Sequence, residues 1–258
     1  MKLRNSISAV GIWLVVFTGE DRKIVTPPVL AAAKVNPADE FCGIRNTAFQ
    51  AGEQVTFHVY YSVVGAYIHA GTATFTTTLG TYANKPVYHV VGDGKTKSSY
   101  DWIYRVRDKY ETITFNRTAN TAVTNSGVFK VPNCVQDVLS AMYYARNVDF
   151  AKYKVEDKIP FKMFLDNEVF DMYIRYLGKE TVKTQYGKFR AIKFKPLLLK
   201  GTIFEGGEKM TVWVSDDPNR VVLRVESPIV VGKVKIDMMS YRNLRYPLTS
   251  MVKLKGSK

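Results

Sequence analysis

The fold is decided by one alternating stretch, QVTFHVYYSV, which spans Gln54 to Val63. Apolar side chains occupy every second position of this stretch, and the positions between them are mostly polar. Because successive side chains of a β-strand point to opposite faces, a period of two predicts a strand with one buried face. The same period recurs along most of the remaining chain, so the sequence predicts a mainly β protein.

Turn residues divide the alternating segments. Gly65 predicts a turn after the first strand, and Asp166-Asn167 predicts a two-residue hairpin loop between two apolar alternations. The glycine-rich triplet at 92–94 predicts a turn that ends a strand over Val87–Val91. About ten short strands joined by connections of hairpin length indicate antiparallel pairing, because parallel strands need long crossovers.

One helix is predicted between the strands, over residues 133–146. Asn133 and Gln136 have the spacing of a capping box at its start. The apolar residues that follow recur at helical spacing, so they form one stripe that must pack on the sheet. This stripe consists of Val135, Val138, Leu139, Met142 and Tyr143.

A sheet with this many strands must curl, split or close to bury its apolar face. We therefore expect a curled antiparallel sheet, a half-barrel or open barrel built as one sheet or as two sub-sheets, packed on one central helix. No linker-like stretch divides the chain. The predicted organisation is an N-terminal segment over 34–45, a single β-rich domain over 46–246 and a frayed basic tail over 247–258.

Residues 1–33 have the pattern of an export signal. Lys2 and Arg4 precede an apolar run from Ile7 to Phe17. This run of about 11 residues is short for a membrane span, which needs about 20. We expect a cleaved signal peptide, with an uncleaved N-terminal anchor and a buried strand of the domain as alternatives. The prediction places the protein outside the cytoplasm, in the periplasm or associated with the outer membrane.

The chain has two cysteines, Cys42 and Cys134. Their separation does not fit a redox C-x-x-C motif or a zinc finger. In an oxidising compartment the two are candidates for one disulfide. The alternative is a pair of unpaired cysteines that are buried as small apolar residues.

The formal net charge is +14 at pH 7. A positive balance favours anionic partners such as lipid headgroups and acidic glycans. Many of the basic residues alternate with apolar neighbours, so a solvated sheet face is the alternative explanation. Export argues against a nucleic-acid partner, and we expect contact with the membrane only through the leader or a bound ligand.

The residues that could carry chemistry do not form a recognisable catalytic pattern. His58, His69 and His89 lie on three successive predicted strands, which could bring imidazoles together around zinc, but no H-E-x-x-H spacing supports this. Glu205 and Glu208 flank a glycine pair and are expected to be solvated. The chain has no G-x-S-x-G motif. We therefore predict no catalytic or metal site, no cofactor and no enzyme activity, and the ligand-binding residues are unknown from sequence.

Aromatic residues are concentrated in the first half of the chain. Tyrosine and tryptophan suit amphipathic or sugar ligands, because each ring combines an apolar body with a polar group. The same residues also fill β cores and cover sheet edges. The cluster consists of Tyr60, Tyr61, Tyr67, Tyr88, Tyr100, Trp102 and Tyr104.

Three blocks of sequence carry a family resemblance: FQAGEQVTF (Phe49–Phe57) with AGTA (Ala70–Ala73), QDVLSA (Gln136–Ala141) continuing to Arg146, and YGKF (Tyr186–Phe189) with Trp213 and Asp216. Over roughly Asn46 to Tyr241 the chain resembles an uncharacterised bacterial envelope family, the domain of unknown function 3108, in its Bacteroides-type version. The resemblance implies a secreted or periplasmic β-rich protein. It supplies no catalytic or binding residues.

These observations lead to one leading hypothesis and two alternatives. We expect an exported, non-enzymatic envelope protein whose curved sheet binds an amphipathic or anionic ligand, a lipid or a glycan. The first alternative is a structural partner in an envelope protein assembly, with a filled core and no ligand cavity. The second is a carbohydrate-active or metal-dependent hydrolase.

Overall fold

The computed structural model describes residues 40–41, 44–63, 65–82, 85–98, 107–111, 113–116, 119–200, 206–229 and 232–254 of the 258-residue chain. The described part is mainly β, as predicted. The predicted leader, Cys42 and residues 255–258 lie outside it. Within the described residues, no helix has the length and apolar composition needed to cross a bilayer.

The described elements comprise many strands, one α-helix and a short 3-10 turn. The helical elements are α1 (Val138–Asn147) and the turn η2 (Phe150–Lys152). The strands are β1 (Glu40–Phe41), β2 (Ile44–Arg45), β3 (Gln54–Val63), β4 (Ala66–Tyr82), β5 (Lys85–Thr96), β6 (Arg107–Glu111), β7 (Thr114–Asn116), β8 (Thr121–Thr124), β9 (Gly127–Lys130), β10 (Lys158–Leu165), β11 (Glu168–Lys183), β12 (Gly187–Pro196), β13 (Thr211–Ser215), β14 (Val222–Pro228), β15 (Lys233–Arg242) and β16 (Met251–Leu254).

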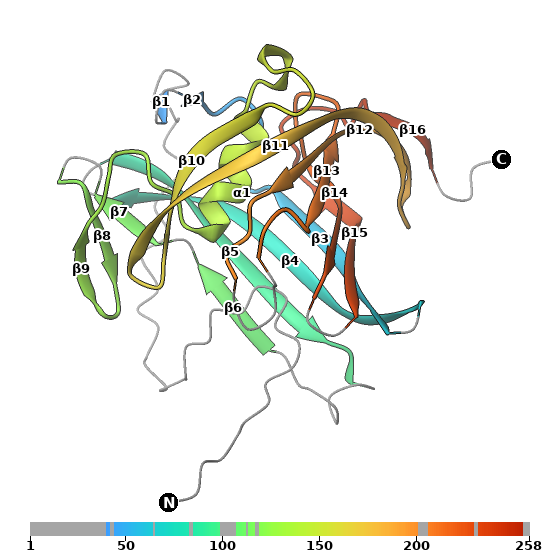
Figure 1. Cartoon of the computed structure of the whole chain (residues 1–258), viewed down its shortest axis with the longest axis horizontal. Helices are drawn as coiled ribbons and strands as arrows, with labels where there is room; N and C mark the ends of the chain where they lie inside the picture. The colour runs from blue at the N-terminus through green and yellow to red at the C-terminus, as the bar shows by residue number, and fades with distance from the viewer. Residues whose placement is uncertain are drawn as a thin grey trace, which may run out of the picture.

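One large antiparallel sheet of eleven strands forms the body of the molecule. Its order is β10-β11-β12-β13-β14-β15-β3-β4-β5-β6, and β16 also pairs with β12. The strands at the two ends of this order, β10 and β6, do not pair with each other, so the sheet is an open half-barrel. Figure 1 shows the sheet curving around α1, which lies at the centre of the molecule.

The register of the central strands explains which face of the sheet is buried. Phe57 of β3 lies directly opposite Met238 of β15 on one side and Ala73 of β4 on the other. Directly opposed residues share a face, so the apolar positions of the three strands line up on the side of α1. We call this side the inner face and the opposite side the outer face.

Two of the predicted turns are confirmed. Gly65 joins β3 to β4 with a φ of 88°. Asp166 and Asn167 join β10 to β11, and their φ values of 51° and 66° are both positive, as a two-residue hairpin loop of type I′ requires.

The turn predicted at residues 92–94 is wrong, because β5 continues through it to Thr96. Gly92 lies opposite Phe75 in the register of β4 and β5. A Cβ atom at Gly92 would come within 3.0 Å of the Phe75 ring. The glycine therefore makes room for an aromatic neighbour within a strand and does not break the strand.

The predicted helix over 133–146 begins too early, since α1 begins at Val138. Asp137 caps it: its carboxylate accepts a hydrogen bond from the Ser140 N–H, and the Ser140 hydroxyl oxygen accepts one from the Asp137 N–H. Asn133 instead accepts a hydrogen bond from the N–H of Cys134, in a turn outside the helix. Asp137 and Ser140 thus form the capping box that Asn133 was predicted to begin.

The frayed tail predicted from residue 247 is also wrong for the described part. Met251–Leu254 form β16, which pairs with the start of β12. Leu248 is buried, and the N–H of Ser250 donates to the Asp217 carboxylate. This segment is ordered by tertiary contacts that local sequence does not reveal.

A buried ion pair fixes α1 to the sheet. Arg146, in the last turn of α1, makes two hydrogen bonds of 2.5 and 2.9 Å to the carboxylate of Glu53, which lies just before β3. The Arg146 side chain is 4% exposed and that of Glu53 is fully buried. Arg146 also donates to the carbonyl oxygens of Ala48 and Asn219. These bonds satisfy the N–H donors of the guanidinium. A buried charge is tolerated only when it is paired and hydrogen-bonded in this way.

Replacement of Arg146 by methionine should lower the free energy of unfolding by about 3–5 kcal/mol, because the Glu53 carboxylate would remain buried without its partner. Urea denaturation measures the change. Lys162→Met is the matched control, since the Lys162–Asp171 pair has exposed side chains and should be worth about 1 kcal/mol or less. Equal losses in the two variants would show that the buried pair does not hold the structure together.

Candidate functional site

The inner face of β3 and β4 carries apolar side chains that α1 covers at one end only. On β4, Phe75 lies next to α1 and is half-buried, Ala73 is half-buried, and Ile68 at the far end is 42% exposed. The register places Val55, Phe57 and Tyr61 of β3 directly opposite these three. We call the six residues the apolar strip: Val55, Phe57, Tyr61, Ile68, Ala73 and Phe75.

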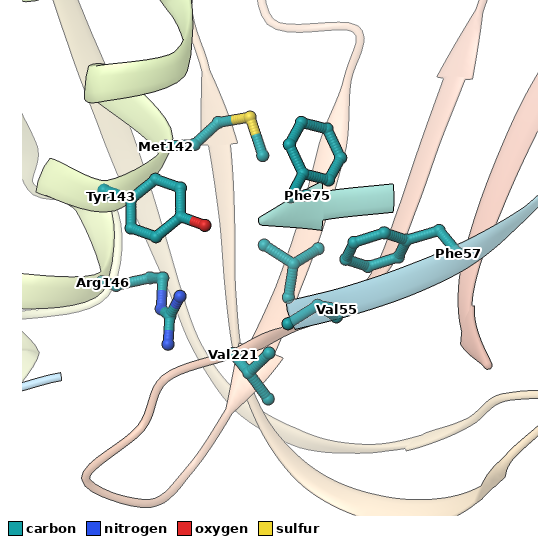
Figure 2. Close-up of a pocket in the computed structure, with 8 residues that line it drawn as sticks. Val55, Phe57, Phe75, Met142, Tyr143, Arg146 and Val221 are labelled. Atoms are coloured by element: carbon teal, nitrogen blue, oxygen red, sulfur yellow. The ribbon is translucent and has the colours of Figure 1, made fainter. Parts of the chain in front are cut away.

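A crevice separates α1 from the near end of the apolar strip. Figure 2 shows Met142, Tyr143 and Arg146 of α1 on one side, facing Phe57 and Phe75 of the sheet on the other. The free space between them is about 20 Å³, enough for one water molecule. The helix therefore sits close to the sheet without sealing against it, and Phe57 and Phe75 belong to both the crevice and the apolar strip.

The lengths and attachments of the elements explain why α1 does not reach the far end of the strip, at Ile68. A helix of ten residues is about 15 Å long, whereas a strand of 17 residues such as β4 extends over about 55 Å. Before α1, Gln136 is hydrogen-bonded to Lys162 and Phe164 of β10. After it, Arg146 is held by Glu53. With both ends attached, α1 cannot slide along β4.

Two polar side chains of α1 and its cap, Tyr143 and Asp137, are already hydrogen-bonded within the protein. Thr77 of β4 donates a hydrogen bond of 2.9 Å to the Tyr143 hydroxyl, and burial raises the pKa of this phenol. Asp137 accepts hydrogen bonds from the N–H groups of Ser140 and Ile113, and burial raises the pKa of its carboxyl. Since these groups are already partnered, the strip and crevice offer a ligand mainly hydrocarbon and aromatic surface.

Comparison with known proteins decides the family. The sequence model of a protein family of unknown function, DUF3108, matches residues 56–126 and 114–239. The chain belongs to DUF3108. The resemblance seen in the sequence is thereby confirmed. In the DUF3108 chain, the first two blocks that carry the resemblance meet in space, because Glu53 of the first binds Arg146 at the end of the second.

Three solved structures are similar to this DUF3108 chain, each over 76% of its length. A Bacteroides fragilis protein with a YmcC-like fold, provisionally described as exported, matches over 97% of its own chain at 12% identity and a TM-score of 0.42. A Parabacteroides distasonis protein, provisionally described as a lipoprotein, matches over 97% at 15% identity and a TM-score of 0.40. A beta-barrel-like protein of the domain of unknown function DUF1849 from Brucella abortus matches over 99% at 8% identity and a TM-score of 0.41. None of the curated proteins matches the sequence.

The three histidines of the DUF3108 chain do not converge. His58 and His69 stack on the outer face with ring centroids 4.0 Å apart. His89 lies on β5 opposite Thr78, nine residues and about 30 Å farther along β4 than His69. Within the described ranges, no three His, Cys, Asp or Glu side chains are placed to share a metal ion.

Cys134 lies in the turn before α1, at a φ of 66°, and is half-buried. Its proposed partner Cys42 is outside the described residues, so the disulfide stays a prediction.

Glu208 was expected to be solvated, and this is wrong. Arg175 binds both of its carboxylate oxygens at 2.6 Å, and Tyr173 donates a third hydrogen bond. Chiefly through the Arg175 hydrogen bonds, the pKa of Glu208 is lowered to about 2. The three residues hold the segment at 206–208 against the outer face of β11. Glu205 lies outside the described residues.

Sequence reasoning did not identify the apolar strip or the partner of Arg146. The strip is visible only once the strands are in register, because its residues are separated from one another along two strands. Glu53 and Arg146 are 93 residues apart. The one available indication was that both are charged residues in blocks that resemble the family.

Acidification should destabilise the protein through the stacked histidines. Burial lowers the pKa of His58 and His69 below the ordinary value of 6.5, and Lys97 lowers both further. The unfolded chain then binds more protons than the folded one, so stability falls as the pH drops below about 6.5. Melting temperatures at pH 7.5 and 5.5 test this: the drop should be smaller in His58→Gln/His69→Gln and unchanged in His89→Gln. An unchanged drop in the double variant would contradict it.

Proposed function

We propose that this DUF3108 protein is an exported, non-enzymatic protein that holds the alkyl chain of an amphipathic molecule on its apolar strip. One observation carries the proposal: the strip is apolar from end to end, and its β4 side chains are half-buried near α1 and exposed at Ile68. Val55 and Phe57 are buried, but Ile68 is an exposed apolar side chain on a concave surface, which is costly in water unless something covers it. Export rests on the apolar leader in the sequence.

The strip is longer than a single alkyl chain and can therefore accommodate one along β4. Ile68 and Phe75 are seven residues apart on β4, which corresponds to about 23 Å. Two opposed layers of acyl chains make a hydrocarbon core of about 30 Å, so one chain spans about 15 Å. The strip is also narrow, since it is built from single rows of side chains on two strands.

Basic residues favour an anionic headgroup. Lys233 is exposed and lies opposite Ser62 on the outer face, at the end of the sheet where the apolar strip ends. The chain as a whole has a formal charge of +14. A headgroup with a phosphate or carboxylate would be attracted to this end of the sheet.

A structural role in an envelope assembly is the second candidate, and the filled core favours it. Phe164, Phe189, Leu223 and Met238 are large side chains with almost no exposure. A core packed in this way provides no hollow interior for a bulky ligand. In this alternative, a partner protein rather than an alkyl chain covers the apolar strip.

A blocked strip tests the proposal. Ala73→Trp would fill its middle, so binding of dansyl-labelled undecanoic acid should weaken by about tenfold or more. Thr74→Trp is the matched control, because residue 74 is the next position on the same strand and faces outward opposite Thr56. Its affinity should equal that of the unaltered protein. Fluorescence titration measures both, and native mass spectrometry of protein from its own cells should show a retained lipid.

Results of two kinds, from titration and from crosslinking in cells, would overturn the proposal. One is the absence of probe binding by the unaltered protein, or equal weakening in both tryptophan variants. The other comes from a photoreactive phenylalanine analogue at position 68 in cells: a single protein adduct without lipid would support the structural role instead.

A further inference from the structure

The outer face of β3 and β4 differs from an ordinary solvated sheet face. From Thr56 to Ser62 on β3 and from Tyr67 to Thr76 on β4, outside the bulge at 70–71, its side chains are hydroxyl-bearing or imidazole groups. Thr56 and Thr74 hydrogen-bond to each other across the two strands. This stretch of the face contains no aliphatic side chain that could insert into a membrane.

Four rings and one ammonium group gather on this face. His58 and His69 stack at 4.0 Å, and Tyr60 lies 5.4 Å from the His69 ring. The Lys235 ammonium lies 5.0 Å from the centre of the Tyr60 ring and 4.3 Å from that of Tyr67. Tyr67 is 41% exposed. We call these five residues the outer cluster.

The two acidic groups nearest the outer cluster, Asp237 and Glu226, are engaged by Arg224. Asp93 and Lys95 of β5, opposite Thr74 and Thr72, also face outward, and their formal charges offset each other. Asp237, directly opposite His58, is fully buried and receives two hydrogen bonds from Arg224 at 2.6 and 3.0 Å. Arg224 also lies 3.7 Å from Glu226. Among the described residues, no ion pair involves Lys235 or Lys97, and Lys97 is exposed. The face therefore presents net positive charge to solvent.

We infer that the outer cluster and the threonines beside it bind a linear acidic glycan. The faces of the tyrosine rings suit the apolar faces of sugar rings, and hydroxyls and imidazoles suit their hydroxyl groups. Lys235 and Lys97 would pair with carboxylate or sulfate groups. Tyr67 and Thr76 are nine residues apart, about 30 Å along the strand, which fits a polymer better than one sugar.

This site is separate from the apolar strip, since the two lie on opposite faces of the same strands. The inference therefore does not depend on the alkyl-chain proposal. Ala73→Trp, which fills the strip, should leave glycan binding unchanged.

The histidines give the site a pH dependence. Burial lowers the pKa of His58, and His69 and Lys97 lower it further, whereas Asp237 opposes them. Burial and Lys97 also lower the pKa of His69. A bound anion would favour the protonated imidazoles, so binding should take up protons and strengthen as the pH falls from 7.5 to 5.5.

The test uses the purified protein with polygalacturonate and heparin as acidic probes and dextran as the uncharged one. Isothermal titration should show binding of an acidic probe that strengthens at lower pH, and no binding of dextran. Tyr67→Ala/Lys235→Gln should weaken binding by about tenfold or more. Tyr246→Ala/Lys130→Gln removes an exposed tyrosine and an exposed lysine elsewhere and should stay within about twofold of the unaltered protein. Melting temperatures confirm that both variants are folded.

Several results would overturn the inference. No binding of either acidic probe would do so, as would equal losses in the two double variants, which would indicate only diffuse charge attraction. Binding to phosphatidylglycerol vesicles that depends on Tyr67 and Lys235, without polysaccharide binding, would assign the site to a membrane surface. If the affinity of a His58→Gln/His69→Gln variant for the acidic probe still rises on acidification, the two histidines do not cause the pH dependence and are not part of the binding site.

Discussion

The structure depends on the buried ion pair between Arg146 and Glu53. The two residues are 93 positions apart, and their contact joins the end of the only α-helix of the described residues to the start of the central strand β3. At its other end, α1 is joined to the edge strand β10 through Gln136. The helix thus bridges two distant parts of an open sheet. Because both ends are fixed, the helix covers only the near end of β4, and Ile68 at the far end of the apolar strip stays exposed.

Both proposed binding surfaces arise from one alternation in the sequence. On β3, Phe57 and Val59 face α1, while His58 and Tyr60 face outward. A half-buried strand normally has only its solvent face available for binding a ligand. Here the inner face is only partly covered, so the same two strands offer a hydrocarbon surface on one side and a basic aromatic surface on the other.

The strands could be predicted from sequence because the period of two is a local property of the chain. The differences between the predicted and the observed structure arise from contacts between residues that are distant in sequence. The start of α1 was misplaced because Asn133 and Asp137 both begin plausible capping boxes, and only the contact of Gln136 with β10 decides between them. The outer cluster was obscured by the bulge between β3 and β4, which changes the parity of His69 relative to His58. The partner of a buried charge and the uncovered part of a sheet are both set by tertiary contacts. The sequence of one chain therefore does not reveal them.

Native-state hydrogen exchange is the most direct test of the central claim that α1 is locked onto the sheet. The account predicts that the slowest amides of α1 open only with global unfolding, with the same free energy as the core amides of β14 and β15. Exchange of the α1 amides through a separate opening of much lower free energy would contradict it, because a helix that detaches by itself is not held by the Arg146–Glu53 pair.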